Sequence, residues 1–187
     1  MREHFWKEVN EARAEGQFRL WENAFPEAEI LDMNVLCDVN QYLSITSGAN
    51  ALGFGHQTMM GPAHASPRVK PFYTEFIANL NRTGTEINWN SFLFYSLSDH
   101  SNGGFNMHGD TESVFLIQGH GDVGMVVENM NKPQDGKKIY HLKTGDALLL
   151  PPLTVHKPIP IGPRVTLSLG ALPKHYEPRP AMVEHRN

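Results

Sequence analysis

Cysteine, clustered basic residues and long apolar runs are all scarce in this sequence. Its single cysteine, Cys37, excludes an internal disulfide and favours a reducing, cytoplasmic location. Lysine and arginine number 16 against 20 acidic residues, so a basic surface that binds duplex nucleic acid is not expected. No apolar run is long enough to span a membrane, and the charged residues 1–16 are unlike a signal peptide, so no membrane partner is expected.

The length and the balance of residue types are typical of one globular domain. The chain has 187 residues, of which 40% are hydrophobic and 19% charged, which is enough to bury a core without disulfides. We expect a single domain over residues 1–187. It divides into a helical and loop flank at 1–90, a β-rich core at 91–172 and a tail at 173–187.

Two segments in the first half show helical spacing. In residues 3–15 the apolar side chains recur at helical intervals, and Gly16 follows where a glycine commonly ends a helix. In residues 71–82 the apolar and aromatic side chains are again three or four positions apart, and Pro71 suits a first helical turn. Both segments are expected to pack against a sheet.

Residues 47–67 are rich in glycine, proline, alanine and serine and are predicted to form a long loop. Loops of this length in compact domains are commonly functional, and this one is a candidate lid. His56, His64 and the pair Met59–Met60 are candidates for lining a substrate entrance there. Cys37 lies in the strand-like run VLCDV, which predicts that the cysteine is buried.

From residue 91 onward, short runs of apolar and β-branched residues alternate with turn signals such as GHG and KTGD. Strands are predicted at 91–97, 104–108, 113–118, 123–128, 137–142, 147–152, 155–159 and 164–172. Short strands at nearly regular spacing are typical of a β-sandwich or barrel. The predicted fold class is therefore mainly β, with helices flanking the strands on the N-terminal side.

His108, Asp110 and His156 form a pattern that suits a metal site. His108 and Asp110 are two positions apart, so a regular strand would place both on one face. Two imidazoles and one carboxylate on one side of a metal leave positions open, as in non-haem Fe(II) oxygenases. Because no cysteine lies nearby, a thiolate site is not expected. These three residues are the predicted Fe(II) ligands and the predicted catalytic centre.

Arg164 follows shortly after the second histidine and suits a dicarboxylate cosubstrate. A guanidinium binds a carboxylate through two parallel hydrogen bonds. Thr166 is expected on the same side of the strand and could add a hydroxyl donor. Tyr95, on the predicted strand before the motif, is a further candidate donor. These three residues are the predicted cosubstrate-binding residues.

Two quoted segments carry a resemblance to a known family. HGDTESVFLIQGHG at 108–121 and KTGDALLLPPLTVH at 143–156 resemble the JmjC-like ribosomal oxygenases, which use Fe(II) and 2-oxoglutarate. The resemblance covers residues 108–172. It implies a double-stranded β-helix, also called a jelly-roll or cupin barrel. It also implies a dioxygenase that hydroxylates its substrate while 2-oxoglutarate is converted to succinate and CO₂, with His108, Asp110 and His156 as iron ligands.

The sequence departs from that family at the cosubstrate anchor. JmjC-like members hold 2-oxoglutarate with a basic residue on the strand after the first motif, and the matching position here is Val123. Arg164 with Thr166 instead resembles the R-x-S/T pattern of the prolyl hydroxylase and phytanoyl-CoA hydroxylase groups. The chain thus combines features of two groups of 2-oxoglutarate oxygenases.

Several alternatives remain open. They are His100, His120 and His141 as metal ligands, Glu112 as the carboxylate ligand, and Lys157 or Arg68 as the cosubstrate anchor. A cupin metalloenzyme that does not use 2-oxoglutarate, such as another dioxygenase or an isomerase, is the second functional hypothesis, and a non-catalytic binding module is the third. A small molecule or a flexible peptide is the expected substrate. The oligomeric state is left open, with a homodimer as one option.

Overall fold

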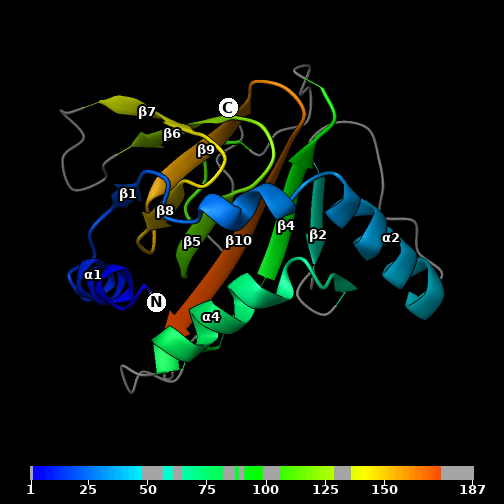
Figure 1. Cartoon of the computed structure of the whole chain (residues 1–187). Helices are drawn as coiled ribbons and strands as arrows, with labels where there is room; N and C mark the ends of the chain where they lie inside the picture. The colour runs from blue at the N-terminus through cyan, green and yellow to red at the C-terminus, as the bar shows by residue number, and fades with distance from the viewer. Residues whose placement is uncertain are drawn as a thin grey trace.

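The computed structural model describes residues 2–47, 57–60, 65–81, 87–88, 91–98, 106–128 and 136–173 (Figure 1). The helices are α1 (Glu3–Ala14), the 3-10 helix η1 (Pro26–Ile30), α2 (Asn34–Ser47) and α4 (Lys70–Asn81). The strands are β1 (Arg19–Trp21), β2 (Gln57–Met60), β3 (Ile87–Asn88), β4 (Ser91–Ser96), β5 (Ser113–Gln118), β6 (Val123–Glu128), β7 (Lys137–Leu142), β8 (Ala147–Leu150), β9 (Val155–Pro160) and β10 (Arg164–Pro173). The result is the mainly β architecture with N-terminal helices that the sequence predicts.

Two antiparallel sheets make up the β structure. The larger sheet has the order β1-β8-β5-β10-β4-β2, with β3 paired to the end of β10, and the smaller sheet has the order β7-β6-β9. In the larger sheet β10 lies between β5 and β4, although both of these strands precede it by many residues. This pairing brings residues 164–171 beside residues 91–96 and 113–118.

The larger sheet is buried on both faces. Phe115 and Ile117 of β5 belong to a core cluster shared with the helices, whereas Val114 and Leu116 belong to a second cluster shared with the smaller sheet. A strand that is buried on both faces requires a continuous apolar run, because successive side chains point to opposite faces. This requirement accounts for the uninterrupted sequence SVFLI in β5.

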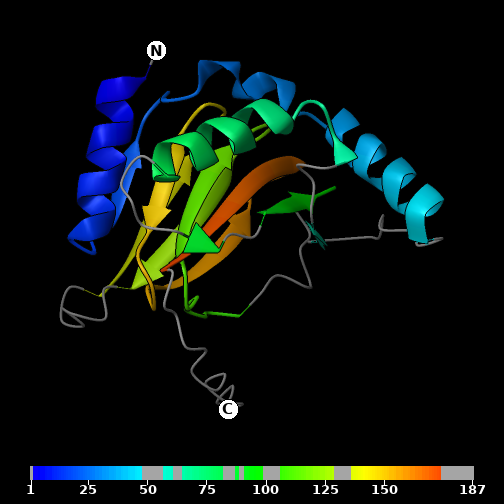
Figure 2. The same ribbon diagram turned by 90° about the horizontal axis from the view of Figure 1, so that it is seen from below.

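The helices cover the outer face of the larger sheet (Figure 2). Phe115 is the common contact of this layer, since its ring stacks on Phe76 of α4 at a centroid distance of 5.7 Å and lies 5.5 Å from the ring of Trp6 in α1. Large aromatic side chains supply much of the burial energy in such a core. Because the helices occupy this face, the opposite face of the sheet is the one that is open to a ligand.

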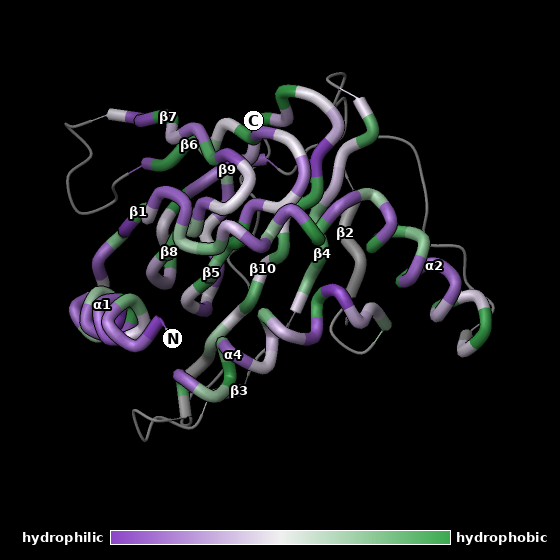
Figure 3. The backbone as a smooth tube through the Cα atoms, in the orientation of Figure 1, coloured by the Kyte–Doolittle hydropathy of each residue, from purple (hydrophilic) through white to green (hydrophobic). Residues whose placement is uncertain are grey.

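Helix α1 is mainly hydrophilic (Figure 3), and its buried side chains are Trp6, Val9 and Ala12. Gly16, with a φ of +63°, follows its last turn. The Gln17 N–H donates to the Ala12 carbonyl at 2.7 Å and the Gly16 N–H donates to the Arg13 carbonyl at 3.1 Å. These two bonds form the glycine-dependent Schellman end of the helix, as the position of Gly16 in the sequence predicts.

The prediction for Cys37 was wrong. The run VLCDV belongs to helix α2, and Cys37 is exposed. Val35, Leu36 and Val39 are fully or almost fully buried and form the inner side of the helix, so Cys37 falls on its outer side. The β-branched residues that favoured a strand are here accommodated in a helix because tertiary packing outweighs their weak intrinsic preference.

The predicted loop at 47–67 also needs correction. Strand β2 lies inside it and pairs with β4, while His56 and His64 lie outside the described residues.

No regular strand forms at 106–108, where His108 makes an isolated bridge to His156. In the first 90 residues the sheet gains β1, β2 and β3, which the sequence did not predict. Among the described residues, none of the helices has the length and apolar character needed to cross a bilayer.

Candidate metal centre

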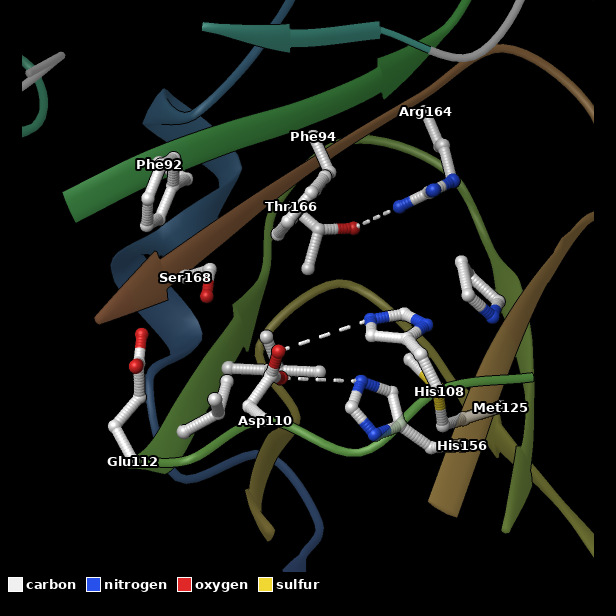
Figure 4. A pocket seen from close by; sticks show the side chains of 13 residues that line it. Phe92, Phe94, His108, Asp110, Glu112, Met125, His156, Arg164, Thr166 and Ser168 are labelled. Carbon is white, nitrogen blue, oxygen red and sulfur yellow. Dashed lines mark hydrogen bonds and ion pairs between the residues drawn. The ribbon is translucent and has the colours of Figure 1, made fainter. Parts of the chain in front are cut away.

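The bridge between His108 and His156 joins two distant parts of the chain. The His108 N–H donates to the His156 carbonyl at 3.1 Å, and the His156 N–H donates to the His108 carbonyl at 2.7 Å. This antiparallel pair fixes the two backbones beside each other, and Asp110 follows two residues later. The three side chains predicted as ligands therefore come together in the structure (Figure 4).

Hydrogen bonds to backbone carbonyls orient both imidazole rings. The His108 Nδ1 atom is 2.8 Å from the Asn106 carbonyl oxygen, and the His156 Nδ1 atom is 2.9 Å from the Thr154 carbonyl oxygen. A carbonyl only accepts hydrogen bonds, so each Nδ1 carries a proton, and Nε2 is the ring nitrogen whose lone pair a neutral imidazole offers to a metal. Histidines that bind metals are commonly oriented in this way.

The Nε2 atoms face the Asp110 carboxylate. His108 Nε2 is 3.8 Å from Asp110 Oδ1, and His156 Nε2 is 3.5 Å from Asp110 Oδ2. The three candidate ligand atoms lie within 4.8 Å of one another. Burial is the main cause that lowers the pKa of His156, which favours the neutral imidazole that a metal requires. Two neutral imidazoles and one carboxylate fit a first-row divalent metal such as Fe(II).

A turn with a positive φ at Leu153 contacts the backbone of the candidate ligand Asp110. Leu153 has a φ of +63°, in a region that L-residues rarely occupy, and its N–H donates to the Asp110 carbonyl at 2.7 Å. Gly109 lies against this turn, since a Cβ at that position would be 3.1 Å from the Leu153 carbonyl carbon and oxygen. The turn therefore couples the backbone of Asp110 to the segment that leads into His156.

Replacement of Gly109 by alanine should weaken metal binding by about ten- to a hundredfold, the usual cost of disturbing a support outside the ligand set. The new methyl group would push against backbone atoms of Leu153, which cannot rotate away as a side chain could. Gly162→Ala is the matched control, because a Cβ there meets no atom within 4 Å. Competition with a chelating dye measures both affinities, and a Gly109→Ala affinity within twofold of wild type would show that the turn adapts.

Arg164 and Thr166 lie on the cavity side of β10, as predicted from their spacing. Arg164 is 1% exposed, and its Nη1 donates to Thr166 Oγ1 at 2.6 Å. The Thr166 hydroxyl donates in turn to Gln118 Oε1 at 2.7 Å. Gln118 is held by donating from Nε2 to the Gly121 carbonyl at 2.9 Å. Thr166 therefore acts as an acceptor that orients the guanidinium, instead of a free donor for a ligand.

Burial lowers the pKa of Arg164 to about 10. The guanidinium still carries its charge near neutral pH, and it does so at a desolvation cost that a bound carboxylate would offset. The two other candidates for the cosubstrate anchor, Arg68 and Lys157, are placed differently. Arg68 pairs with Asp32 and Asp38, and Lys157 alternates with His156 along β9, so it points away from the histidine's face.

Tyr95 is not retained as a cosubstrate residue. It is fully buried in the core cluster between the larger sheet and the helices, on the face that also carries Leu93. The residues of β4 that line the cavity are Phe92 and Phe94. The error has a physical cause, because both faces of β4 carry aromatic residues and the sequence does not show which face is turned toward the ligands.

The ligands and Arg164 line one cavity of about 250 Å³ between the two sheets (Figure 4). Its apolar walls are formed by Phe92, Phe94, Val114, Leu116, Met125 and Pro158. Ser168 and Glu112 also line it, and burial, together with the nearby charge of Asp110, raises the pKa of Glu112. Alternation along β10 from Arg164 and Thr166 was the signal that could have identified Ser168.

The other histidines considered as metal ligands do not join this group among the described residues. His120 and His141 are exposed, and neither belongs to the group of residues that could share a metal. His100 lies outside the described residues. Val123, at the position of the basic anchor in the JmjC-like pattern, is fully buried in the apolar cluster between the sheets. It offers no charge to a ligand.

Fold and site together define a cupin-type β protein with a His-Asp-His candidate metal centre. Neither the protein-family models nor the curated proteins include a match to this sequence. Among solved structures, the chain is similar to the ribosomal oxygenase YcfD from Escherichia coli in complex with cobalt and 2-oxoglutarate. It is 20% identical to that protein with a TM-score of 0.51, over 65% of this chain and 33% of the other.

A second structure of the same Escherichia coli protein, in complex with cobalt and succinic acid, is 21% identical with a TM-score of 0.52. The match covers 67% of this chain and 34% of that one. This chain thus spans about a third of the length of YcfD. At this level of identity the comparison establishes a shared fold, the double-stranded β-helix of the cupin type that the sequence motifs predict.

Proposed function

We propose that the protein is an Fe(II)- and 2-oxoglutarate-dependent dioxygenase that hydroxylates a small molecule or a peptide. The observation that carries the proposal is the presence of the His-Asp-His group and the buried Arg164 in one cavity. A metal site alone would fit many cupin enzymes. A buried, oriented guanidinium in the same cavity supports a dicarboxylate cosubstrate in addition.

Each residue has a defined task under this proposal. His108, Asp110 and His156 would hold Fe(II), which, when bound with 2-oxoglutarate, supplies the oxidising chemistry that yields succinate, CO₂ and a hydroxylated substrate. Arg164 would bind the carboxylate of 2-oxoglutarate that lies away from the metal. Thr166 and Gln118 keep the guanidinium in place by the hydrogen bonds already described. The apolar walls exclude water from the reacting groups.

The likeness to YcfD supports the proposal at the level of fold. That protein is named a ribosomal oxygenase, and its structures contain cobalt with 2-oxoglutarate or with succinic acid. A ribosomal substrate is not carried over to this chain, which spans only about a third of the length of YcfD. The candidate substrates remain small molecules and peptides.

Succinate production from 2-oxoglutarate is the direct test. Purified protein with Fe(II), 2-oxoglutarate, ascorbate and dioxygen should release succinate, and a panel of amino acids and peptides should raise the rate where a substrate is present. His156→Ala should remove the activity, because it loses a metal ligand. Full metal binding without any binding or consumption of 2-oxoglutarate would instead support a cupin metalloenzyme of another kind. Lack of metal binding would support a non-catalytic binding module.

A further inference from the structure

Glu112 is a cavity residue with no task in the proposed chemistry. It lies two residues after Asp110, and its carboxylate lies beside Gly170 of β10. A Cβ at Gly170 would be 3.0 Å from Glu112 Oε1 and 3.4 Å from Glu112 Cγ. The missing side chain of Gly170 therefore makes the space in which the carboxylate rests.

The Glu112 carboxylate has few polar partners among the residues that the structure describes. Its hydrogen bond from Thr111 Oγ1 is long, at 3.5 Å, and among the described residues no lysine, arginine or histidine lies within ion-pair distance of it. A half-buried carboxylate with so few partners has capacity for further hydrogen bonds from a ligand. Because Glu112 lines the cavity, a ligand could supply them there.

Aromatic faces adjoin this end of the cavity. Phe92 is paired in register with Ser168, two residues before Gly170, and its ring is stacked with that of Phe94 at 6.2 Å and an interplanar angle of 26°. Both rings are only partly buried and line the cavity. The faces of aromatic rings attract cations, most strongly where water is excluded. Carboxylate and aromatic faces together favour a positively charged group.

The Glu112 end is distinct from the Arg164 end. The Arg164 guanidinium reaches Thr166, and Gly170 lies four positions further along β10, which corresponds to about 13 Å of extended strand. Figure 4 shows Glu112 and Arg164 on opposite sides of the cavity, with Thr166 between them and the side chains of His108, Asp110 and His156 along one side. A five-carbon dicarboxylate held by Arg164 is shorter than this span, so it would leave the Glu112 end vacant for the substrate.

From these observations we infer that Glu112 determines substrate specificity by binding a cationic group of the substrate, an ammonium or a guanidinium, against the rings of Phe92 and Phe94. The inference rests on the proposed function, since it assumes that the substrate reaches the metal centre from this end. The cavity then has an anion-binding end at Arg164 and a cation-binding end at Glu112, with the candidate metal centre along one side of it.

Binding of matched neutral and charged probes tests the inference. The probes are amide-capped lysine against capped norleucine, and capped arginine against capped citrulline, titrated calorimetrically under anaerobic conditions with metal and 2-oxoglutarate present. In the wild type, at least one cationic probe should bind on the order of ten- to a hundredfold more tightly than its neutral partner, as expected for hydrogen bonds to a charged group. Comparison of the two pairs distinguishes ammonium from guanidinium.

Two variants test the role of Glu112 itself. Glu112→Gln should reduce the charged-to-neutral ratio to nearly one. Gly170→Ala should also reduce it, because the new methyl group displaces the flexible end of Glu112 without removing the carboxylate. Glu22→Gln, which alters an exposed glutamate in a turn, is the control and should leave the ratio unchanged.

Separate titrations of metal and of 2-oxoglutarate distinguish failure of the inference about Glu112 from failure of the proposed function. Both affinities should remain within about twofold of wild type in Glu112→Gln and Gly170→Ala. Equal binding of charged and neutral probes by the wild type, absence of cationic probe binding, or an unchanged ratio in Glu112→Gln would each overturn the inference. Absence of metal or 2-oxoglutarate binding in the wild type would overturn the proposed function as well.

Discussion

Replacement of His156 by alanine should abolish stoichiometric Fe(II) binding and leave the fold largely intact. The imidazole is one of three candidate ligands, and no further histidine, cysteine or carboxylate among the described residues joins this group. We expect a loss of more than about a hundredfold in affinity, since disturbing an indirect support alone costs ten- to a hundredfold. Metal analysis after anaerobic reconstitution gives the occupancy, and circular dichroism reports on the fold.

The exposed His141 on β7 provides the matched control. His141→Ala removes the same side chain outside the cavity and should keep full iron occupancy. Asp110→Ala should lose activity as His156→Ala does, whereas Asp110→Glu should keep only weak metal binding, because the longer side chain misplaces the carboxylate. Full occupancy in His156→Ala would show that this histidine is not a ligand. Normal turnover of Asp110→Ala would transfer the carboxylate role to Glu112.

The strands of the core were predictable because each is bounded by strong turn signals. The run SVFLIQ ends at GHG, where Gly121 has a φ of +73° and a Cβ would be 2.1 Å from the Pro163 carbonyl oxygen. Glycine is needed at such a place, so the end of the strand is visible in the sequence. Helix α2 was missed because its inner side is formed by valine and leucine, which occur equally in strands.

The grouping of the three candidate ligands was predictable for a different reason. His108 and Asp110 share local spacing, and the segment before His156 ends a predicted strand, so the three residues could be proposed without knowing the sheet order. Gln118 could not be assigned in this way. Its contact with Thr166 depends on the pairing of β5 with β10, which are distant in sequence. A local sequence pattern does not show which two distant strands pair, and this pairing decides which side chains meet.

The position of Glu112 in the cavity could not be predicted, for the same reason. In the sequence it was only an alternative carboxylate near the H-x-D motif. Only the folded structure places its carboxylate beside Gly170 of the last strand. The direction in which Tyr95 points was likewise not encoded locally, since Phe92, Phe94 and Tyr95 are similar residues on one strand.

Loss of Arg164 should weaken 2-oxoglutarate binding by roughly a hundred- to several-thousandfold. Removing one partner of a buried charge pair costs about 3–5 kcal/mol, because the other charge is left in a poorly hydrated site, and this energy converts to that range of dissociation constants. Arg164→Met keeps the length of the apolar stem and removes the charge, so it tests the guanidinium with little loss of packing. Arg164→Lys should recover only part of the affinity, because an ammonium cannot form the two parallel bonds.

The effect should be confined to the cosubstrate, because Arg164 lies on β10 and the three candidate metal ligands lie at 108–110 and on β9. Anaerobic calorimetric titration with 2-oxoglutarate, after the Fe(II) affinity of each variant has been measured, separates the two sites. Arg68→Met is the control, since Arg68 pairs with Asp32 and Asp38 on the surface. An Arg164→Met affinity within a few-fold of wild type would place the anchor elsewhere. If the wild type itself failed to bind 2-oxoglutarate while binding iron, the buried guanidinium would have to serve another anion, and the protein would be a cupin enzyme of a different kind.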